Sequence, residues 1–441
     1  MATNVALTGL ARDLAARAEA GSPIRIGLVG AGEMGTDIVS RVAHMRGIAI
    51  GAISELKPGA AARAVEIAYG DRARARDVAG ADSANAAMEA GAIAVTDDVD
   101  ALLGAGLIDV VVDATGIPAV GAEIGLRAME RGKHLVMMNV EADVTIGAYL
   151  RAEAERLGVV YTLGAGDEPS SCMELIEFVS AMGHRIVCAG KGKNNPLDVD
   201  ATPDAYADEA RRRHMNPRML VEFVDGSKTM VEMAAIANAT GLVPDRPGMH
   251  GPAAGREALS RVLVPASAGG VLSSGEGRVD YTVGRGVAPG VFVVAEMEHP
   301  RIRERMEDLK MGDGPYFTFL RPYHLTSLEV PLSCARAVLY GKADMVPLPR
   351  PVAEVCALAK RSLAPGERLG QIGEYGYRAW IMTADEARAA GAVPCGLLAG
   401  ATVTAPIPKG GLITAANAAV PPDSRIVALR ARQDAMTGLR P

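Results

Sequence analysis

The stretch AGKGKNN at residues 189–195 combines residue types that could bind an anion. Its polar side chains are two ammoniums and two amides, those of Lys191, Lys193, Asn194 and Asn195. An ammonium attracts an anion as a point charge, an amide donates hydrogen bonds, and the glycines let the backbone approach. An apolar run at 186–189 predicts a strand just before the cluster. We therefore expect a phosphate or carboxylate of a substrate to bind there; solvated lysines in a surface loop are the alternative.

Three further residues could complete such a catalytic site. Lys228 and Glu232, in DGSKTMVEM, stand one helical turn apart, a spacing that is also typical of an ordinary ion pair on a solvated face. His250 lies in the loop PGMHGP, where it is either catalytic or without a role. His324, in RPYHL, is expected to be structural.

Carboxylates near the basic cluster could hold a metal ion. Asp198 and Asp200 follow it directly, and carboxylate oxygens suit Mg²⁺ or Mn²⁺. If a divalent cation binds, Asp198, Asp200 and Glu232 are the candidate ligands. Asp167 and Glu168, in GAGDEPS, fall at the expected junction of two domains.

A glycine-rich turn near the start of the chain predicts a dinucleotide site. The segment IRIGLVGAGEMG carries the G-x-G-x-x-G spacing in Gly30, Gly32 and Gly35. The first glycine permits a tight turn, the second lets the backbone approach a pyrophosphate, and the third lets helix and strand pack closely. Glu33 and Met34 open the helix, whose N–H groups and dipole favour phosphates.

The choice between NAD and NADP stays open from the residues alone. Glu55 lies about 20 residues beyond the turn, where a carboxylate binds the ribose hydroxyls and disfavours a 2′-phosphate. Ser54 and Lys57 favour the opposite choice, because a hydroxyl and an ammonium can bind that phosphate.

Two later turns are expected to face the same cofactor crevice. The first, in DATG, is a turn of small residues that could lie under the nicotinamide ribose; the second, MNVEAD, follows the next strand. The cofactor candidates in these turns are Ala114, Thr115, Gly116, Asn139 and Glu141. Asp143 is expected to face the crevice as well.

The alternation of short apolar runs and helical segments predicts an α/β fold. Expected strands are 24–29, 48–53, 93–95, 109–113, 135–138 and 159–163, with helices between them. Such a pattern is typical of a doubly wound parallel sheet of the Rossmann type. We expect three domains: a Rossmann domain at 1–165, an α+β substrate and dimerisation domain at 166–345, and a small β-rich domain at 346–441.

Composition restricts the class of protein. Of 441 residues, 49% are apolar and 22% charged, and the net charge of −6 suggests neither disorder nor a nucleic-acid partner. The chain contains no run of the ~20 apolar residues that a membrane span needs, and its amphipathic N-terminal helix is not a signal peptide. The five scattered cysteines suggest reduced thiols. We expect a cytoplasmic protein with no membrane partner.

Several motifs together resemble a known family. GLVGAGEMG, DATG, MNVEADVTIG, LGAGDEPSS, AGKGKNN, RPYHL and the C-terminal GGLIT are similar to segments of homoserine-dehydrogenase-like oxidoreductases that end in a SAF domain. Within them, the chain resembles the 1-deoxy-D-xylulose 5-phosphate reductoisomerase-like enzymes over nearly its whole length.

The resemblance implies an activity and a set of partners. It implies NADPH-dependent conversion of 1-deoxy-D-xylulose 5-phosphate to 2-C-methyl-D-erythritol 4-phosphate, an isoprenoid precursor, in a homodimer with a divalent cation. The motifs of the standard reductoisomerase are not found, so its metal ligands are not transferred to this chain.

Two alternative functions remain at this point. A plain NAD(P)-dependent dehydrogenase of the homoserine type would act on another small hydroxy-carbonyl substrate without isomerisation. A non-catalytic sensor would bind the nucleotide only as a ligand and use its SAF-like module to bind a sugar or a protein.

Overall fold

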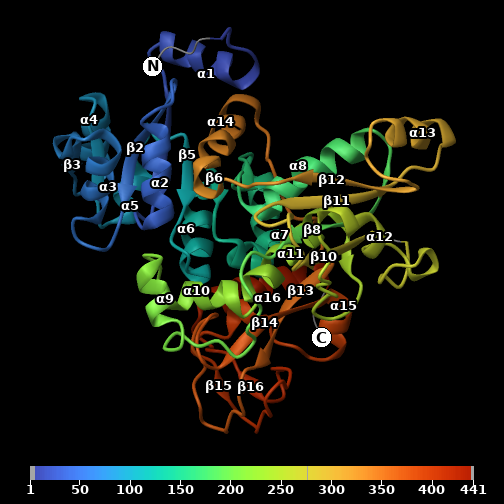
Figure 1. Ribbon diagram of the computed structural model, residues 1–441. Helices are drawn as coiled ribbons and strands as arrows, with labels where there is room; N and C mark the ends of the chain where they lie inside the picture. Colours follow the sequence, from blue (N-terminus) through green and yellow to red (C-terminus); the bar gives the residue numbers. More distant parts are fainter. Residues whose placement is uncertain (1–4, 276, 439–441) are drawn as a thin grey trace. The chain divides into compact units, whose positions relative to one another are not determined.

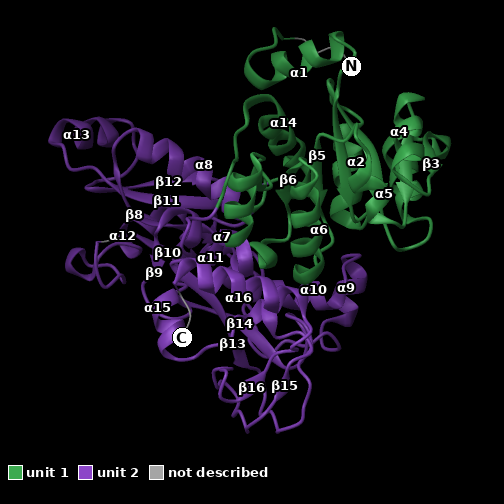
Figure 2. Cartoon of the chain, turned by 180° about the vertical axis from the view of Figure 1, so that it is seen from behind, with its two compact units in different colours: residues 1–143, 149–167, 325–346 green, residues 144–148, 168–324, 347–441 purple. Residues whose placement is uncertain are grey.

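The computed structural model describes residues 5–275 and 277–438 (Figure 1). Two compact units divide the chain (Figure 2). Unit 1 consists of residues 1–143, 149–167 and 325–346, and unit 2 of residues 144–148, 168–324 and 347–441. The separate domain that we expect at 346–441 therefore falls within the same compact unit as residues 168–324.

Unit 1 is built on a seven-stranded parallel sheet with the order β3-β4-β2-β1-β5-β6-β7. The strands are β1 (Ile24–Val29), β2 (Ile48–Ser54), β3 (Ala75–Asp77), β4 (Ile93–Thr96), β5 (Val110–Asp113), β6 (His134–Met137) and β7 (Tyr161–Leu163). The doubly wound α/β fold expected from the sequence is confirmed. The order reverses between β1 and β5, and ligands bind such sheets at this switch point, beyond the carboxyl ends of the strands.

Helices that precede, connect and follow the strands accompany the sheet of unit 1. They are α1 (Gly9–Glu19), α2 (Glu33–Val42), α3 (Ala60–Tyr69), α4 (Ala81–Glu89), α5 (Val99–Gly104), α6 (Pro118–Glu130), α7 (Val140–Leu157) and the later α14 (Val330–Tyr340). Fully buried residues such as Ile26 and Leu28 of β1 pack with Ile38 of α2 in one core cluster. The short edge strand β3 was not expected, because its partly exposed residues form no apolar run.

Unit 2 contains a five-stranded mixed sheet with the order β12-β11-β8-β10-β9. The strands are β8 (Arg185–Gly192), β9 (Val243–Pro244), β10 (Arg278–Thr282), β11 (Val291–Glu296) and β12 (Tyr316–Arg321). Strands β8, β9 and β10 run parallel, whereas β11 is antiparallel to both β8 and β12. It follows that β12, β8, β10 and β9 all end at the same edge of the sheet. We call it the carboxyl edge.

The remaining elements of unit 2 support this sheet. Its helices are α8 (Glu168–Ala181), α9 (Ala207–Arg212), α10 (Pro217–Val224), α11 (Ser227–Thr240), α12 (Leu259–Val262), α13 (Pro300–Asp308), α15 (Ala384–Ala389) and α16 (Arg425–Thr437). Residues 347–441 form two small antiparallel pairs, β13 (Ala353–Ala359) with β14 (Tyr377–Thr383), and β15 (Thr402–Val403) with β16 (Ala418–Ala419). The short strands expected for this segment are thus present.

Among the residues that the structure describes, no helix is both long enough and apolar enough to span a bilayer.

Candidate functional site

The glycine turn of unit 1 has the geometry that its spacing predicts. Gly30 has φ +97°, and a Cβ atom there would lie 2.7 Å from the carbonyl oxygen of Ala114. A Cβ on Gly35 would overlap the Gly30 carbonyl oxygen, so this glycine allows α2 to pack on the turn. A Cβ on Gly32 would meet no heavy atom within 4 Å. The predicted roles of the first and third glycines are confirmed, and the space beside Gly32, at the start of α2, suits a pyrophosphate.

Glu55 lies against this turn. Its Oε2 accepts a hydrogen bond from the Ala31 N–H at 2.7 Å, and its Oε1 accepts one from the Lys57 N–H at 2.8 Å. Ser54 is buried and Lys57 is exposed. A carboxylate fixed at the glycine turn lies where the ribose hydroxyls of a dinucleotide bind, and its charge would repel a 2′-phosphate.

The turn after β5 is held by a buried acid. Asp113 accepts hydrogen bonds from the Thr115 backbone N–H at 3.2 Å and from its hydroxyl at 2.8 Å. Burial raises the pKa of Asp113 to about 6, although its bonds to Thr115 oppose the shift. Gly116 has φ +65° and open space beside it, which keeps this turn accessible.

Two side chains expected in the cofactor crevice have structural roles instead. Asn139 is buried and caps α7, since its Oδ1 accepts a hydrogen bond from the Ala142 N–H at 3.2 Å. Asp143 is also buried and accepts a hydrogen bond from the Tyr161 hydroxyl at 2.6 Å. Glu141 is only partly buried and lies in the first turn of the same helix.

The buried Asp143 predicts a pH-dependent stability. Burial raises its pKa to about 6, so the folded state binds this proton more tightly than the unfolded chain does. Its ionisation therefore costs up to ~3 kcal/mol, a cost that grows as pH rises from the unfolded pKa near 4 through about 6. Asp143→Asn keeps an acceptor for Tyr161 and removes the charge. We expect a higher urea midpoint than wild type above pH 6 and convergence near pH 4. Equal midpoints across this range would contradict a charged, buried Asp143.

The central cluster of unit 2 is built around Lys191. Its ammonium donates hydrogen bonds to Glu168, with Nζ to Oε1 at 2.5 Å, and to Glu232. The side chains of Lys191, Glu168 and Glu232 are 6%, 11% and 0% exposed. Burial alone would lower the pKa of Lys191, but the two carboxylates outweigh it and hold this pKa above its ordinary value. Lys191 therefore stays protonated in a protected place, paired with two carboxylates.

His324 joins this cluster through Glu168, so our expectation of a purely structural histidine does not fit its position. Its Nδ1 lies 2.6 Å from the Pro289 carbonyl oxygen, which can only accept, so Nδ1 carries the hydrogen. Its Nε2 is then directed to Glu168 Oε2, 3.5 Å away. His324 is partly exposed, so the arrangement links solvent to Lys191 through Glu168.

The carboxyl edge explains how these residues meet. Lys191 is the last but one residue of β8 and is paired with Tyr281 of the parallel strand β10. His324 follows the end of β12, and His250 follows the end of β9. Four strand ends therefore present side chains along one edge, where parallel sheets bind their ligands.

Lys193 does not lie as the predicted phosphate site requires. Its ammonium donates to the backbone carbonyls of Asn195 at 2.7 Å, Pro196 at 3.3 Å and Phe223 at 2.8 Å, which uses all three N–H groups. Burial, and then the charge of Lys191, lower the pKa of Lys193 to about 8. Lys193 thus shapes the loop after β8 rather than binding a phosphate.

The asparagines of the predicted anion cluster do not form a joint site with Lys191 either. Asn194 is exposed, and the Asn195 side-chain oxygen accepts a hydrogen bond from Arg213 at 3.1 Å. Lys228 is partly buried in the first turn of α11, one turn before Glu232. Of Lys228 and Glu232, which were both predicted as catalytic, Glu232 accepts a hydrogen bond from Lys191.

Asp198 and Asp200 do not form the predicted metal site. Asp198 accepts hydrogen bonds from the Tyr206 hydroxyl at 3.0 Å and the Asp200 N–H at 3.2 Å, and Asp200 pairs with Lys409 at 2.6 Å. In the described part of the chain, neither belongs to a group of three or more His, Cys, Asp or Glu side chains close enough to share an ion.

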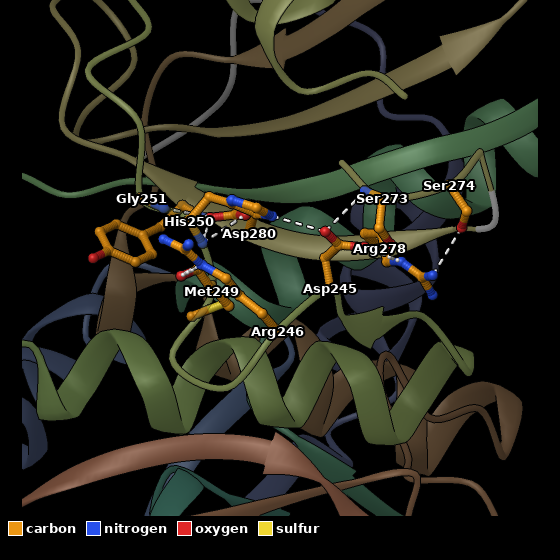
Figure 3. Close-up of polar contacts among 10 residues, drawn as sticks. Asp245, Arg246, Met249, His250, Gly251, Ser273, Ser274, Arg278 and Asp280 are labelled. Carbon is orange, nitrogen blue, oxygen red and sulfur yellow. Dashed lines mark hydrogen bonds and ion pairs between the residues drawn. The ribbon is translucent and has the colours of Figure 1, made fainter. Parts of the chain in front are cut away.

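His250 is held by a network of polar contacts (Figure 3). Its Nε2 lies 2.8 Å from Asp245 Oδ2, and Asp245 also accepts hydrogen bonds from Ser273 and from Arg278 Nε at 2.9 Å. Burial opposes ionisation of Asp245, but these bonds lower its pKa to about 2. The ionised Asp245 therefore orients the His250 ring at the carboxyl edge.

A second acid fixes the backbone of the same loop. Asp280 accepts hydrogen bonds from the N–H groups of His250 at 3.0 Å, Gly251 at 2.9 Å and Tyr281 at 2.8 Å. Burial nevertheless raises the pKa of Asp280. Neither Asp245 nor Asp280 was singled out from the sequence, because their partners are up to 33 residues away.

Two family models match this chain. Residues 30–163 match the NAD binding domain of homoserine dehydrogenase, and residues 166–330 match the catalytic domain of oxidoreductase DRL. These matches support an oxidoreductase of the DRL type, and neither includes residues beyond 330. No curated protein matches the chain by sequence.

Solved structures resemble the chain only distantly. One described as a probable dehydrogenase from Thermotoga maritima is 14% identical with a TM-score of 0.42, and covers 73% of this chain and 90% of its own. An apo scyllo-inositol dehydrogenase from Lactobacillus casei is 14% identical with a TM-score of 0.40, and covers 73% and 89%. Such low scores carry no argument about a substrate. The family matches identify an NAD(P)H-dependent oxidoreductase.

Proposed function

We propose that this NAD(P)H-dependent oxidoreductase acts on a small hydroxy-carbonyl compound whose carbonyl oxygen binds the Lys191 ammonium. The observation that carries the proposal is the buried position of Lys191 between Glu168 and Glu232. A fixed positive charge, shielded from water, stabilises the negative charge that develops on a carbonyl oxygen when hydride reaches its carbon.

The bound nicotinamide cofactor supplies the hydride. As the carbonyl double bond opens, its electron pair moves to the oxygen, and the resulting alkoxide takes a proton from Lys191. An alkoxide is far more basic than an amine, so this transfer is favourable even with the raised pKa of Lys191. Glu168 lies between Lys191 and His324, so a proton taken up by His324 can return to Lys191 through Glu168. In the oxidative direction each transfer reverses.

The divalent cation that the resemblance implies does not fit this cluster. Asp167, Glu168 and His324 have ligand atoms within 4.8 Å of one another, close enough to share an ion. However, the ammonium of Lys191 already binds Oε1 of Glu168, and a metal ion bound to the same carboxylate would be repelled by that ammonium. Lys191 therefore takes the part of the cation, and no step is assigned to a metal.

A second candidate function is the reductoisomerase reaction. The match of residues 166–330 to the DRL catalytic domain favours it. Here the carbon skeleton of 1-deoxy-D-xylulose 5-phosphate would first rearrange to a branched aldehyde, a step that needs one oxygen stabilised and a neighbouring hydroxyl deprotonated. The ammonium of Lys191 and the carboxylate of Glu168 or Glu232 offer both functions. The reductoisomerase function also predicts a homodimer, because the resemblance implies one.

For the cofactor, Glu55 favours NADH, whereas the resemblance implies NADPH. The exposed Lys57 is the residue that could offset the repulsion between Glu55 and a 2′-phosphate. The two cofactors are therefore compared in the same experiment.

The experiment measures oxidation of NADH and of NADPH by the full-length chain with two substrate classes. One is 1-deoxy-D-xylulose 5-phosphate, and the other is a panel of small aldehydes and ketones that can be reduced without rearrangement. Products are identified by NMR. Simple reduction products support the first proposal, and 2-C-methyl-D-erythritol 4-phosphate supports the second. Oxidation of neither cofactor by any hydroxy-carbonyl compound would contradict both.

A further inference from the structure

An anionic substrate needs a cation that is not already paired. Lys191 and Lys193 are both paired, and the asparagines beside them carry no charge. Arg378 of β14 is a cation that remains available. In the described part of the chain, no carboxylate or carbonyl accepts a hydrogen bond from its guanidinium, which instead lies over the Trp380 ring, 4.8 Å from the centroid. A guanidinium has five N–H donors in a fork that matches carboxylates and phosphates. Arg378 thus keeps its full capacity for an anion.

The acids near Arg378 do not neutralise it. Asp225 and Asp200 act on its charge electrostatically, but each is paired elsewhere. Asp225 binds the buried Lys360 at 2.6 Å, and Asp200 binds Lys409 at 2.6 Å. Excess positive charge therefore remains on Arg378.

Backbone contacts fix β14 beside the carboxyl edge. The Ala379 N–H donates to the hydroxyl of Ser227, the first residue of α11, at 2.9 Å. The Ile381 carbonyl accepts from the Gly248 N–H, in the loop that carries His250, at 2.8 Å. Arg378 lies in β14 next to the first of these anchors and two residues from Trp380.

Tyr281 is paired with Lys191 in the sheet and also feels the charge of Arg378. It is paired with Lys191 in the ladder between β8 and β10, so the two side chains stand on the same face of adjacent strands. Tyr281 also lies within the electrostatic range of Arg378 and Arg246. No hydrogen bond of its hydroxyl is found among the described residues, so it can donate one to a ligand.

We propose that Arg378 binds the anionic group of the substrate, a phosphate or a carboxylate, while Lys191 binds the carbonyl oxygen. The inference deepens the proposed function and rests on it. It gives the C-terminal segment, which neither family match includes, a direct part in substrate binding, with Tyr281 between the two cations.

The test uses the full-length chain saturated with NAD⁺ or NADP⁺, whichever it binds, so that an anion cannot occupy the pyrophosphate site. Inorganic phosphate and acetate are titrated separately by calorimetry into wild type, Arg378→Gln, Arg378→Lys and Arg425→Gln. Arg425 is an exposed arginine on the same segment and serves as the matched control. Thermal melting and cofactor affinity establish that each variant is folded.

We expect Arg378→Gln to weaken binding of one anion by about 10-fold or more, Arg378→Lys to weaken it less, and Arg425→Gln to leave it unchanged. Binding of phosphate alone indicates a phosphorylated substrate, and binding of acetate indicates a carboxylate. Equal affinity in wild type and Arg378→Gln, or no binding of either anion to wild type, would overturn the inference. This experiment measures binding and no turnover, so its result does not depend on whether Lys191 takes part in catalysis. A failure of the anion site is therefore distinguishable from a failure of the proposed function.

Discussion

Lys191→Ala should lower kcat/KM by about 10³-fold or more, with the cofactor affinity unchanged. The loss follows from removing the ammonium that we propose stabilises the developing alkoxide, while Glu168 and Glu232 remain as two carboxylates without their shared cation. Cofactor affinity is the internal control, because the glycine turn and Glu55 belong to unit 1. Initial rates and cofactor titrations measure both quantities on the same samples.

Two variants separate a chemical role of Lys191 from a structural one. Lys191→Arg keeps the charge and the pairing but moves the donors, so we expect a folded protein with a large loss in kcat. Small primary amines added to Lys191→Ala should restore part of the rate, since they can supply a proton to the vacated position. A folded Lys191→Ala enzyme with wild-type kcat/KM would remove Lys191 from the mechanism.

Lys360→Met should lower the free energy of unfolding by about 3–5 kcal/mol. The Lys360 ammonium binds Asp225 at 2.6 Å, and the two side chains are 3% and 0% exposed. Removing the cation leaves Asp225 buried and charged, and burial already raises the pKa of this carboxyl. The carbonyls of Ala201 and Glu374 would also lose a donor. Urea denaturation of the full-length chain measures the effect.

The double variant Lys360→Met with Asp225→Asn is the matched control. The amide introduced at position 225 would keep an acceptor for the Ser227 N–H, which lies 2.8 Å from Asp225 Oδ1, without a buried charge. We expect the double variant to be more stable than Lys360→Met alone. If both proteins unfold at the wild-type midpoint, the pair does not couple residues 347–441 to the rest of unit 2.

Local patterns in the sequence were sufficient for unit 1. The roles of Gly30 and Gly35 follow from their spacing within a single turn, and buried parallel strands form apolar runs that can be read directly. The predicted strands coincide with six of the seven strands in its sheet, and the exception, β3, lies at its edge. Side chains that cap or fill the core, such as Asn139 and Asp143, cannot be separated from cofactor ligands by spacing alone.

The site of unit 2 depends on contacts that spacing does not encode. Lys191 was predicted as an anion-binding residue, but its partners Glu168 and Glu232 lie 23 and 41 residues away. Lys193, two residues further on, was also predicted to bind an anion, but its ammonium donates hydrogen bonds to three backbone carbonyls. The two lysines differ because β8 ends between them, at Gly192. His324 comes to the carboxyl edge only through the order of the strands, and β14, which carries Arg378, is fixed through its contacts with Ser227 and Gly248.

The most direct test of the central claim is the rate of the enzyme without divalent cations. The claim is that the buried Lys191 ammonium, held by Glu168 and Glu232, does the work of a metal ion. After exhaustive treatment with EDTA and dialysis, kcat/KM should equal that of the untreated enzyme and should not rise when Mg²⁺ or Mn²⁺ is added. Loss of activity on chelation, with recovery on adding either ion, would contradict the claim.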